Sequence, residues 1–310
     1  MAYSTLSTTS QLNQIAMYVG RFAPSPTGPL HFGSLVAAVA SYCEAKANQG
    51  LWLVRMEDVD KPREMKGAAD EILHTLLAFG FEWSGEVVYQ SQRTSLYQQA
   101  FDQLQNNGFI YACSCSRKEI ADSATNGIEG LVYPGTCRSG MLQPRAQHAW
   151  RVKVTDEIVS FNDAIQGYQV QQLSRDIGDF VLKRADGLFA YQLAVVVDDA
   201  LQHITHIVRG ADLLNSTPRQ IYLQQLLGFN QPLYTHIPLA VNNQGEKLSK
   251  QNLALPINKQ HAPQLIFDAL VFLGQNPPLA IKQSSLPEVW QWAIQNWQNS
   301  KISHQQSINI

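Results

Sequence analysis

The stretch RFAPSPTGPLHFGS, residues 21–34, decides the fold of this chain. A short strand is predicted over residues 16–21, where the stretch begins. Residues 23–29 contain three prolines and one glycine, which exclude a helix there. An Ala-rich helix is predicted directly afterwards, over residues 33–47. A glycine-containing turn that leads into a helix suits an anion, because free backbone N–H groups point at the ligand. We therefore expect a phosphate-binding junction at His31, where Gly33 lets a planar base approach the backbone closely.

The residues that follow this junction alternate between strand and helix patterns. A nearly continuous apolar run over residues 51–56 predicts a buried strand, and residues 68–78 and 94–106 predict helices. Later in the chain, residues 193–197 and 206–208 predict strands, and residues 218–227 predict a helix. This order is typical of a parallel α/β sheet, so we expect a Rossmann-like core with helices on both faces.

The pattern breaks in the middle of the chain, which divides it into five predicted parts. Residues 111–178 hold a cysteine cluster, Gly/Pro-rich segments and short alternating runs, and they predict an inserted subdomain. The remaining parts are a disordered tail, the two halves of the core and a C-terminal helical region, predicted over residues 1–15, 16–110, 179–255 and 256–310.

The helical region has its own expected features. Trp290, Ile294 and Trp297 are spaced to lie on one helix face, which predicts a packing stripe. The last residues, 300–310, are expected to be frayed.

Composition sets the outer limits. The chain has 310 residues, with 23 Lys and Arg against 25 Asp and Glu, so its net charge of −2 gives no general indication of nucleic-acid binding. That length allows about two domains. Its apolar runs are far shorter than the ~20 residues of a membrane-spanning helix. Four cysteines cannot cross-link a fold of this size, and the first twenty residues lack a signal pattern, so we expect a cytoplasmic protein without membrane contact.

Three of the four cysteines form a candidate metal site. Cys113, Cys115 and Cys137 offer three thiolates, and tetrahedral zinc requires a fourth ligand. Both Tyr133, four residues before Cys137, and His148 could complete the site. A zinc closed by four protein ligands is structural, and it would stabilise an insertion that has little core of its own.

A second candidate phosphate site lies late in the chain, in the run GEKLSKQ at residues 245–251. Lys247 and Lys250 flank Ser249, and a mobile loop of this kind can bring two ammonium groups onto a triphosphate. Taken alone, the same run could be a solvated basic turn.

Together, the two stretches resemble the two signature motifs of class I aminoacyl-tRNA synthetases, and residues 21–34 resemble those of the glutamate-specific branch. The resemblance covers residues 19–253, with Ser34 in place of the last histidine of the first motif. It implies an ATP complex with Mg²⁺. It also implies catalytic roles for His31, Lys247 and Lys250, and ATP contacts from His31, Gly33 and Lys250.

The resemblance continues through residues 55–63, 178–199 and 205–214, and it implies an amino-acid pocket. Glutamate carries two carboxylates and one ammonium, which two arginines and one carboxylate match, because a guanidinium pairs with a carboxylate bidentately. Arg21 is expected at the side-chain carboxylate, Arg209 at the α-carboxylate and Glu57 at the ammonium. The implied glutamate-binding residues are Arg21, Ala23, Ser25, Glu57, Tyr191 and Arg209.

Length narrows the resemblance further. Only residues 254–310 follow the core, too few for the helical anticodon-binding domain of a glutamyl-tRNA synthetase. A shortened core with a Cys-x-Cys and Tyr-x-x-x-Cys site is similar to the glutamyl-Q tRNA(Asp) synthetases, which implies Tyr133 as the fourth zinc ligand. It also implies a monomer that activates glutamate with ATP, without tRNA, and transfers it to queuosine at the wobble position of tRNA(Asp). The alternative is a truncated conventional synthetase that charges a tRNA 3′ end.

Overall fold

The computed structural model describes residues 17–141, 143–246 and 256–310. The predicted tail, residues 1–15, and both loop lysines, Lys247 and Lys250, therefore lie outside the described residues. The helices are α1 Phe32–Ala47, α2 Ala68–Ala78, α3 Thr94–Asn106, α4 Arg117–Ala121, α5 Leu173–Asp176, α6 Tyr191–Leu201, α7 Thr217–Leu227, α8 Ala262–Phe272 and α9 Leu286–Asn296. The strands are β1 Val19–Phe22, β2 Leu51–Met56, β3 Val88–Tyr89, β4 Ile110–Cys113, β5 Thr125–Gly127, β6 Gly130–Val132, β7 Ala149–Val152, β8 Ile158–Asp163, β9 Gly167–Gln172, β10 Val181–Lys183, β11 His206–Gly210, β12 Leu233–Ile237, β13 Leu239–Val241 and β14 Ser307–Asn309.

Parallel strands form the centre of the molecule, as the sequence predicted. β2 pairs in parallel with both β1 and β3, and β12 pairs in parallel with β11. The two groups lie side by side, because the Thr205 amide just before β11 donates to the Val19 carbonyl of β1 at 2.9 Å. The helices α2 and α3 span the residues predicted for them.

Helices cover both faces of these strands, and alternate strand residues enter two different hydrophobic cores. On β11, Val208 packs in the core that includes residues of α1, α8 and α9, whereas its neighbour Ile207 packs with α3, α6 and α7. On β2, Trp52 and Val54 belong to the first core, and Leu53 packs against the second. Successive side chains of a strand point to opposite faces, so this division confirms an α/β fold with two covered faces.

Two local predictions were wrong. Residues 193–197, predicted as a strand, belong to α6, because a short run of buried apolar residues satisfies either structure and only its tertiary context decides. Residues 300–310, predicted as frayed, contain β14, which pairs in parallel with β13, and Ile302 is buried in the first core. The pairing partner of β14 lies more than sixty residues away in sequence, beyond any local pattern.

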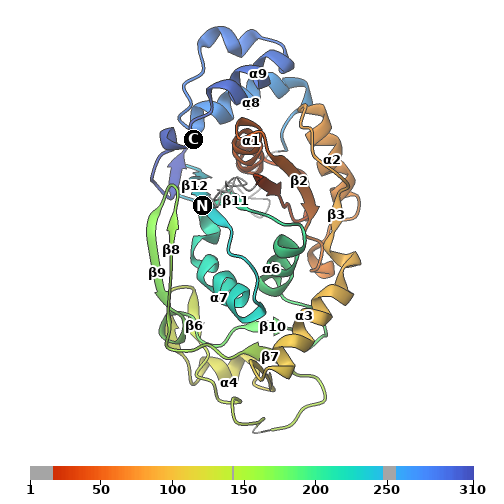
Figure 1. Ribbon diagram of the computed structural model, residues 1–310, viewed down its shortest axis with the longest axis vertical. Helices are drawn as coiled ribbons and strands as arrows, with labels where there is room; N and C mark the ends of the chain where they lie inside the picture. Colours follow the sequence, from red (N-terminus) through yellow and green to blue (C-terminus); the bar gives the residue numbers. More distant parts are fainter. Residues whose placement is uncertain (1–16, 142, 247–255) are drawn as a thin grey trace, which may run out of the picture.

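The predicted insertion holds β4 and β7, which form a small antiparallel sheet with β10, and the β5–β6 hairpin. Strand pairing crosses the predicted boundary at residue 178, because β10 lies beyond it and still pairs with β7. The β8–β9 hairpin joins the central strands instead, through the parallel pairing of Tyr234 with Asp163. The insertion elements α4 and β7 lie at one end of the elongated molecule, and α8 and α9 lie at the other (Figure 1).

The C-terminal helices pack as the sequence predicted. Trp290 is buried against Tyr42 and Phe81, and its indole N–H donates to the Phe79 carbonyl at 2.8 Å. Ile294 and Trp297 pack against the same core, which confirms the packing stripe.

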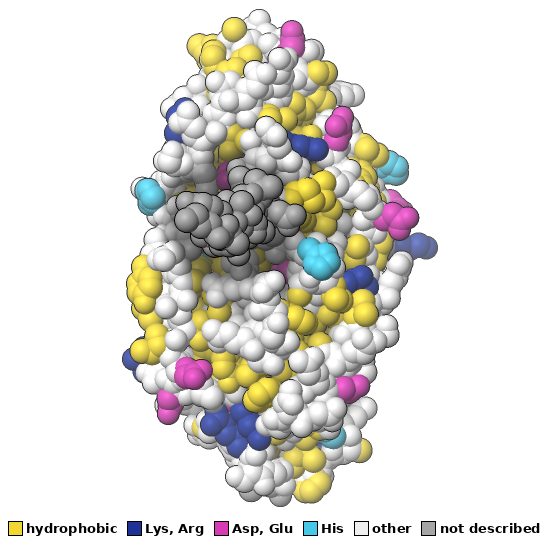
Figure 2. Space-filling model, viewed as in Figure 1, with side chains coloured by type: hydrophobic (Ala, Val, Ile, Leu, Met, Phe, Trp, Pro, Cys, Tyr) yellow, Lys and Arg dark blue, Asp and Glu magenta, His cyan; other side chains and the backbone are white. Residues whose placement is uncertain are grey.

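The surface of the molecule mixes both signs of charge. Figure 2 shows acidic and basic side chains scattered over one face, with one compact Lys and Arg group near the end that carries α4 and β7. Among the residues that the structure describes, no helix has the length and apolar character needed to cross a membrane.

Candidate active site

The turn at residues 23–29 leads from β1 to α1 and is hydrogen-bonded to the segment that follows β2. The Pro24 carbonyl accepts a hydrogen bond from the Glu57 amide at 2.9 Å, and the Pro26 carbonyl accepts one from the Met65 amide, also at 2.9 Å. These bonds hold the turn against the segment that follows β2. Ligands of open α/β sheets bind beyond the carboxyl ends of the strands, and the predicted phosphate and amino-acid residues meet in this region.

His31 is the N-cap of α1, as the sequence predicted. Its Nδ1 accepts the Ser34 amide at 3.3 Å, and its Nε2 lies 3.0 Å from the Ser34 hydroxyl. With Nδ1 accepting, the hydrogen of the neutral ring lies on Nε2 and faces the Ser34 hydroxyl, so donation to a phosphate oxygen would replace that contact. Ser34, which departs from the usual motif, contacts the histidine that remains.

A cavity of about 100 Å³ opens beside this junction. Five of the six residues predicted to bind glutamate line it, whereas Ser25 is exposed and does not belong to its lining. Its walls come from β1, β11 and the segments that follow them, from the segment that follows β2, from α1 and from the start of α6. The lining residues are Arg21, Phe22, Ala23, Ala37, Glu57, Tyr191, Val208, Arg209, Gly210 and Leu213.

A buried ion cluster forms one side of the cavity. Asp199 lies 3.1 Å from Arg21 Nε and 2.8 Å from Arg55 Nη1, and Arg55 Nη2 lies 3.2 Å from Glu57. Burial opposes ionisation of Asp199, but Arg21 and Arg55 outweigh it and lower the pKa of that carboxyl. For Glu57 the balance is opposite, since burial raises its pKa more than Arg55 lowers it. A substrate ammonium beside Glu57 would act against burial and favour its ionised form.

Arg209 forms the other side of the cavity and is 5% exposed. Its Nε donates to His236 Nε2 at 3.0 Å, and its Nη2 donates to Thr217 and Gln220 at 2.8 Å each. Nη1 is buried and has no hydrogen-bond partner among the described residues. This arrangement leaves one nitrogen of the guanidinium available to a carboxylate in the cavity.

Several residues that support the site were not assigned roles from the sequence. Asp199 lies in the segment 178–199, which carries part of the resemblance. Its contacts with two arginines depend on the fold and could not be predicted from that segment. Its neighbour Asp198, also buried, accepts bonds from Gln90, Arg93 and Tyr97. The sequence did offer one signal, since Asp198 and Asp199 directly follow an apolar run. Acidic residues are rarely buried unless they are paired, so this position indicates partners. His236 carried no sequence signal.

The three clustered cysteines lie together, as predicted. Their Sγ atoms are all within 4.8 Å of one another, and those of Cys115 and Cys137 are 3.5 Å apart. Ligands at about 2.3 Å from a tetrahedral zinc are themselves about 3.8 Å apart. The Tyr133 hydroxyl lies 3.4 Å from Cys113 Sγ and 3.3 Å from Cys115 Sγ, so four donor atoms surround one point.

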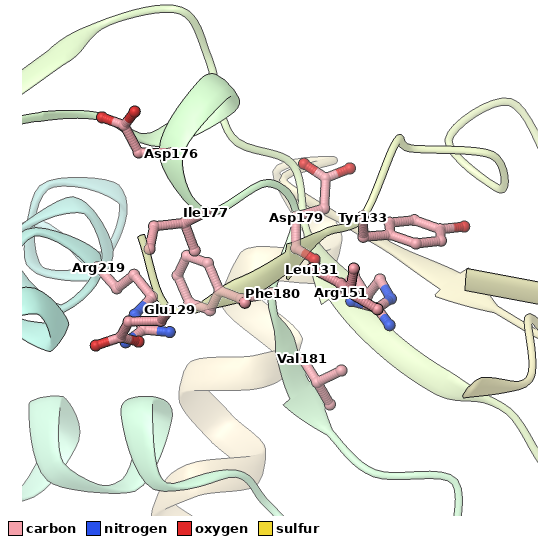
Figure 3. Close-up of a pocket in the computed structure, with 11 residues that line it drawn as sticks. Glu129, Leu131, Tyr133, Arg151, Asp176, Ile177, Asp179, Phe180, Val181 and Arg219 are labelled. Atoms are coloured by element: carbon pink, nitrogen blue, oxygen red, sulfur yellow. Dashed lines mark hydrogen bonds and ion pairs between the residues drawn. The ribbon is translucent and has the colours of Figure 1, made fainter. Parts of the chain in front are cut away.

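The alternative fourth ligand lies elsewhere. His148 Nδ1 is 3.1 Å from the Arg145 carbonyl, and the histidine does not belong to the metal-ligating group found among the described residues. Tyr133 is buried, and the Arg151 guanidinium lies 4.1 Å from its ring centroid. Figure 3 shows Tyr133, Arg151 and Asp179 on one side of a second cavity, of about 180 Å³, with Arg219 and Glu129 on the other.

Comparisons with known proteins decide the family. The model for tRNA synthetases class I (E and Q), catalytic domain, matches residues 18–278. The glutamyl-Q tRNA(Asp) synthetase of Dechloromonas aromatica is 56% identical over 293 residues, covering 94% of this chain and 97% of the relative. That of Chromobacterium violaceum is 56% identical over 287 residues, covering 93% and 96%. The chain belongs to the glutamyl-Q tRNA(Asp) synthetase family.

Membership of this family confirms the resemblance read from the two signature motifs. Among solved structures, glutamate-tRNA synthetase from Elizabethkingia anophelis superposes with a TM-score of 0.77 at 24% identity. The match covers 93% of this chain and 67% of that chain, so the shared part is the fold described above. The curated relatives, in contrast, match this chain over nearly their whole length.

Proposed function

We propose that the protein is a ligase that activates L-glutamate with ATP, without tRNA, and transfers it to queuosine at the wobble position of tRNA(Asp). The observation that carries this proposal is that two arginines and one glutamate line the same cavity. Arg21, Arg209 and Glu57 line it together, and they match the two carboxylates and one ammonium of glutamate. The names of the relatives in this family support the same substrates.

In the proposed binding mode, Arg21 contacts the side-chain carboxylate and Arg209 the α-carboxylate. Glu57 accepts the α-ammonium, and Tyr191 and Ala23 complete the walls of the cavity. Asp199 holds Arg21 through Nε and Nη2, at 3.1 and 3.4 Å, so that the guanidinium is oriented before the substrate arrives. A pre-oriented group loses less conformational entropy on binding.

The activation step is attack of the glutamate α-carboxylate on the α-phosphorus of ATP, which releases pyrophosphate. The nucleophile is already ionised, so no general base is required. Catalysis then depends on alignment and on cations placed where negative charge grows. We assign this role to His31 at the N-terminus of α1 and to Lys247 and Lys250, while Gly33 and His31 contact ATP. Mg²⁺ bound with ATP neutralises charge on the pyrophosphate.

Transfer breaks the mixed anhydride between glutamate and AMP. A hydroxyl of the queuosine cyclopentenediol attacks the glutamyl carbonyl, an ester bond forms, AMP leaves with the anhydride oxygen, and the hydroxyl proton passes to the departing phosphate. Since AMP is a stable anion, this step also requires no strong acid.

We further propose that Cys113, Cys115, Tyr133 and Cys137 hold one structural zinc ion. The donor set fits, because three thiols and one phenol approach to tetrahedral spacing. A bound zinc would cross-link β4 to the segment that follows β6, in a cluster with few other apolar residues. Burial raises the pKa of Cys115 to about 11, and a bound cation acts in the opposite direction.

The direct test of activation is glutamate-dependent exchange of pyrophosphate into ATP with the purified protein. We expect exchange with glutamate alone, and none with aspartate or with no amino acid. Exchange that appears only after tRNA is added would overturn the proposal and favour a conventional synthetase.

A further inference from the structure

The ends of β8 and β12 bring a carboxylate and an imidazole together next to Arg209, which lines the cavity. His236 Nδ1 lies 2.6 Å from Asp163 Oδ2, and both side chains are completely buried. The same carboxylate accepts backbone amides from Ile165, Gln166 and His236, at 2.8 to 3.1 Å. Four donors on one buried carboxylate fix its position. Asp163 is therefore rigid, and the ring that it holds is rigid too.

The contacts of the ring determine its protonation. Arginine can only donate hydrogen bonds, so Nε2 of His236 must be the acceptor for Arg209 Nε, at 3.0 Å. The hydrogen of the neutral ring then lies on Nδ1 and is donated to Asp163. Burial, together with the charge of Arg209, lowers the pKa of His236 to about 4, even though Asp163 acts in the opposite direction. The ring is thus a neutral acceptor at physiological pH.

This acceptor completes the set of bonds that orients Arg209. A guanidinium has five N–H donors. His236 takes the one on Nε, and Thr217 and Gln220 take the two on Nη2, so two remain, both on Nη1. Nη1 is buried without a partner among the described residues, and Arg209 lines the cavity. A buried donor without a partner is costly unless a ligand supplies an acceptor.

We propose that Asp163 and His236 are positioning residues for substrate recognition, which hold Arg209 so that its Nη1 faces the α-carboxylate of glutamate. The inference rests on the proposed function, because it takes glutamate as the ligand of Arg209. His236 touches neither substrate nor reacting atoms. His236 orients the guanidinium of Arg209. Its loss should therefore weaken the affinity for glutamate more than the affinity for ATP or the stability of the fold.

Two substitutions separate the contact with Arg209 from the contact with Asp163. In His236→Asn, the shorter amide can keep the bond to Asp163 but leaves Arg209 Nε without an acceptor. In His236→Gln, the longer side chain can place an oxygen near the former Nε2. Tyr222→Phe is the matched control, because it removes one buried hydrogen bond of α7, to the Lys153 carbonyl at 2.7 Å, without contacting Arg209.

The readout is pyrophosphate exchange with separate titration of glutamate and ATP. We expect His236→Asn to raise the KM for glutamate about tenfold, the equivalent of one hydrogen bond to a charged group. His236→Gln should show a smaller increase, and the KM for ATP should change less than about twofold in both. Tyr222→Phe should match the wild-type protein.

Two results would overturn the inference alone. One is a wild-type KM for glutamate in His236→Asn, and the other is an equal rise in the KM values for glutamate and ATP, which indicates general loss of structure. A wild-type protein without glutamate-dependent exchange would instead refute the proposed function, and this inference with it.

Discussion

Removing the charge of Asp199 should lower the free energy of unfolding. It lies on α6, is buried, and forms ion pairs with two arginines from two different strands, Arg21 of β1 and Arg55 of β2. Asp199→Asn keeps the shape of the side chain and one acceptor oxygen but removes its charge. Arg55, which is completely buried, then keeps only Glu57 and Asp198 as nearby carboxylates.

The magnitude follows from these contacts. Asp199 accepts Arg21 at 3.1 and 3.4 Å, and Arg55 Nη1 lies 2.8 Å away. A hydrogen bond to a charged group contributes about 1.5–3 kcal/mol, and removing one partner of a buried ion pair costs about 3–5 kcal/mol. Because asparagine retains one acceptor, we expect a loss near the lower end, about 3 kcal/mol of the free energy of unfolding.

Urea unfolding measures this loss, with the fluorescence of the six tryptophans as the probe. With a slope of about 3 kcal/mol per M, the unfolding midpoint should fall by about 1 M. Asp186→Asn is the matched control, because Asp186 is half exposed in its ion pair with Arg184 and should contribute less than about 1 kcal/mol. Equal midpoints for Asp199→Asn and the wild-type protein would refute the reasoning that this carboxylate holds the site together.

Three further predictions concern the loop, the metal and the buried histidine. Lys250→Ala should abolish glutamate-dependent pyrophosphate exchange, whereas Lys259→Ala, at an exposed pair with Glu71, should leave it unchanged. Cys115→Ser should lose its zinc, measured by elemental analysis, and should unfold at a lower temperature; full zinc content would contradict the proposed ligand set. Between pH 6.5 and about 4 the unfolded chain binds a proton at His236 that the folded protein excludes, so stability should fall as the pH falls. From pH 6.5 to 5 that loss is about 1.6 kcal/mol, and it should be absent in His236→Gln.

The sequence predicted the parts of the fold that depend on local pattern. The strand at residues 51–56 and the helices α2 and α3 follow from apolar periodicity and turn residues, and their bounds agree with the structure. The strand predicted over residues 193–197 was wrong, because five buried apolar residues are compatible with a strand and with a helix. The pairing of β14 with β13 was not predicted, because it depends on a partner that is distant in the sequence.

The candidate site divides in the same way. Arg21, Glu57 and Arg209 were found through motifs, because they lie in segments with strong local signatures. The residues that orient them were not, since Asp199 and His236 act across elements and contact arginines 178 and 27 positions away. Such contacts appear only when the strands are placed side by side. The sequence could therefore predict which charged groups line the cavity, but not which groups hold them in place.

The proposed function requires that glutamate is transferred to a modified base rather than to a tRNA 3′ end. The experiment supplies labelled glutamate, ATP and the protein to tRNA(Asp) with queuosine and to tRNA(Asp) without it. We expect label on the queuosine-containing tRNA alone. Equal labelling of both tRNAs, or labelling of tRNA(Glu), would contradict it.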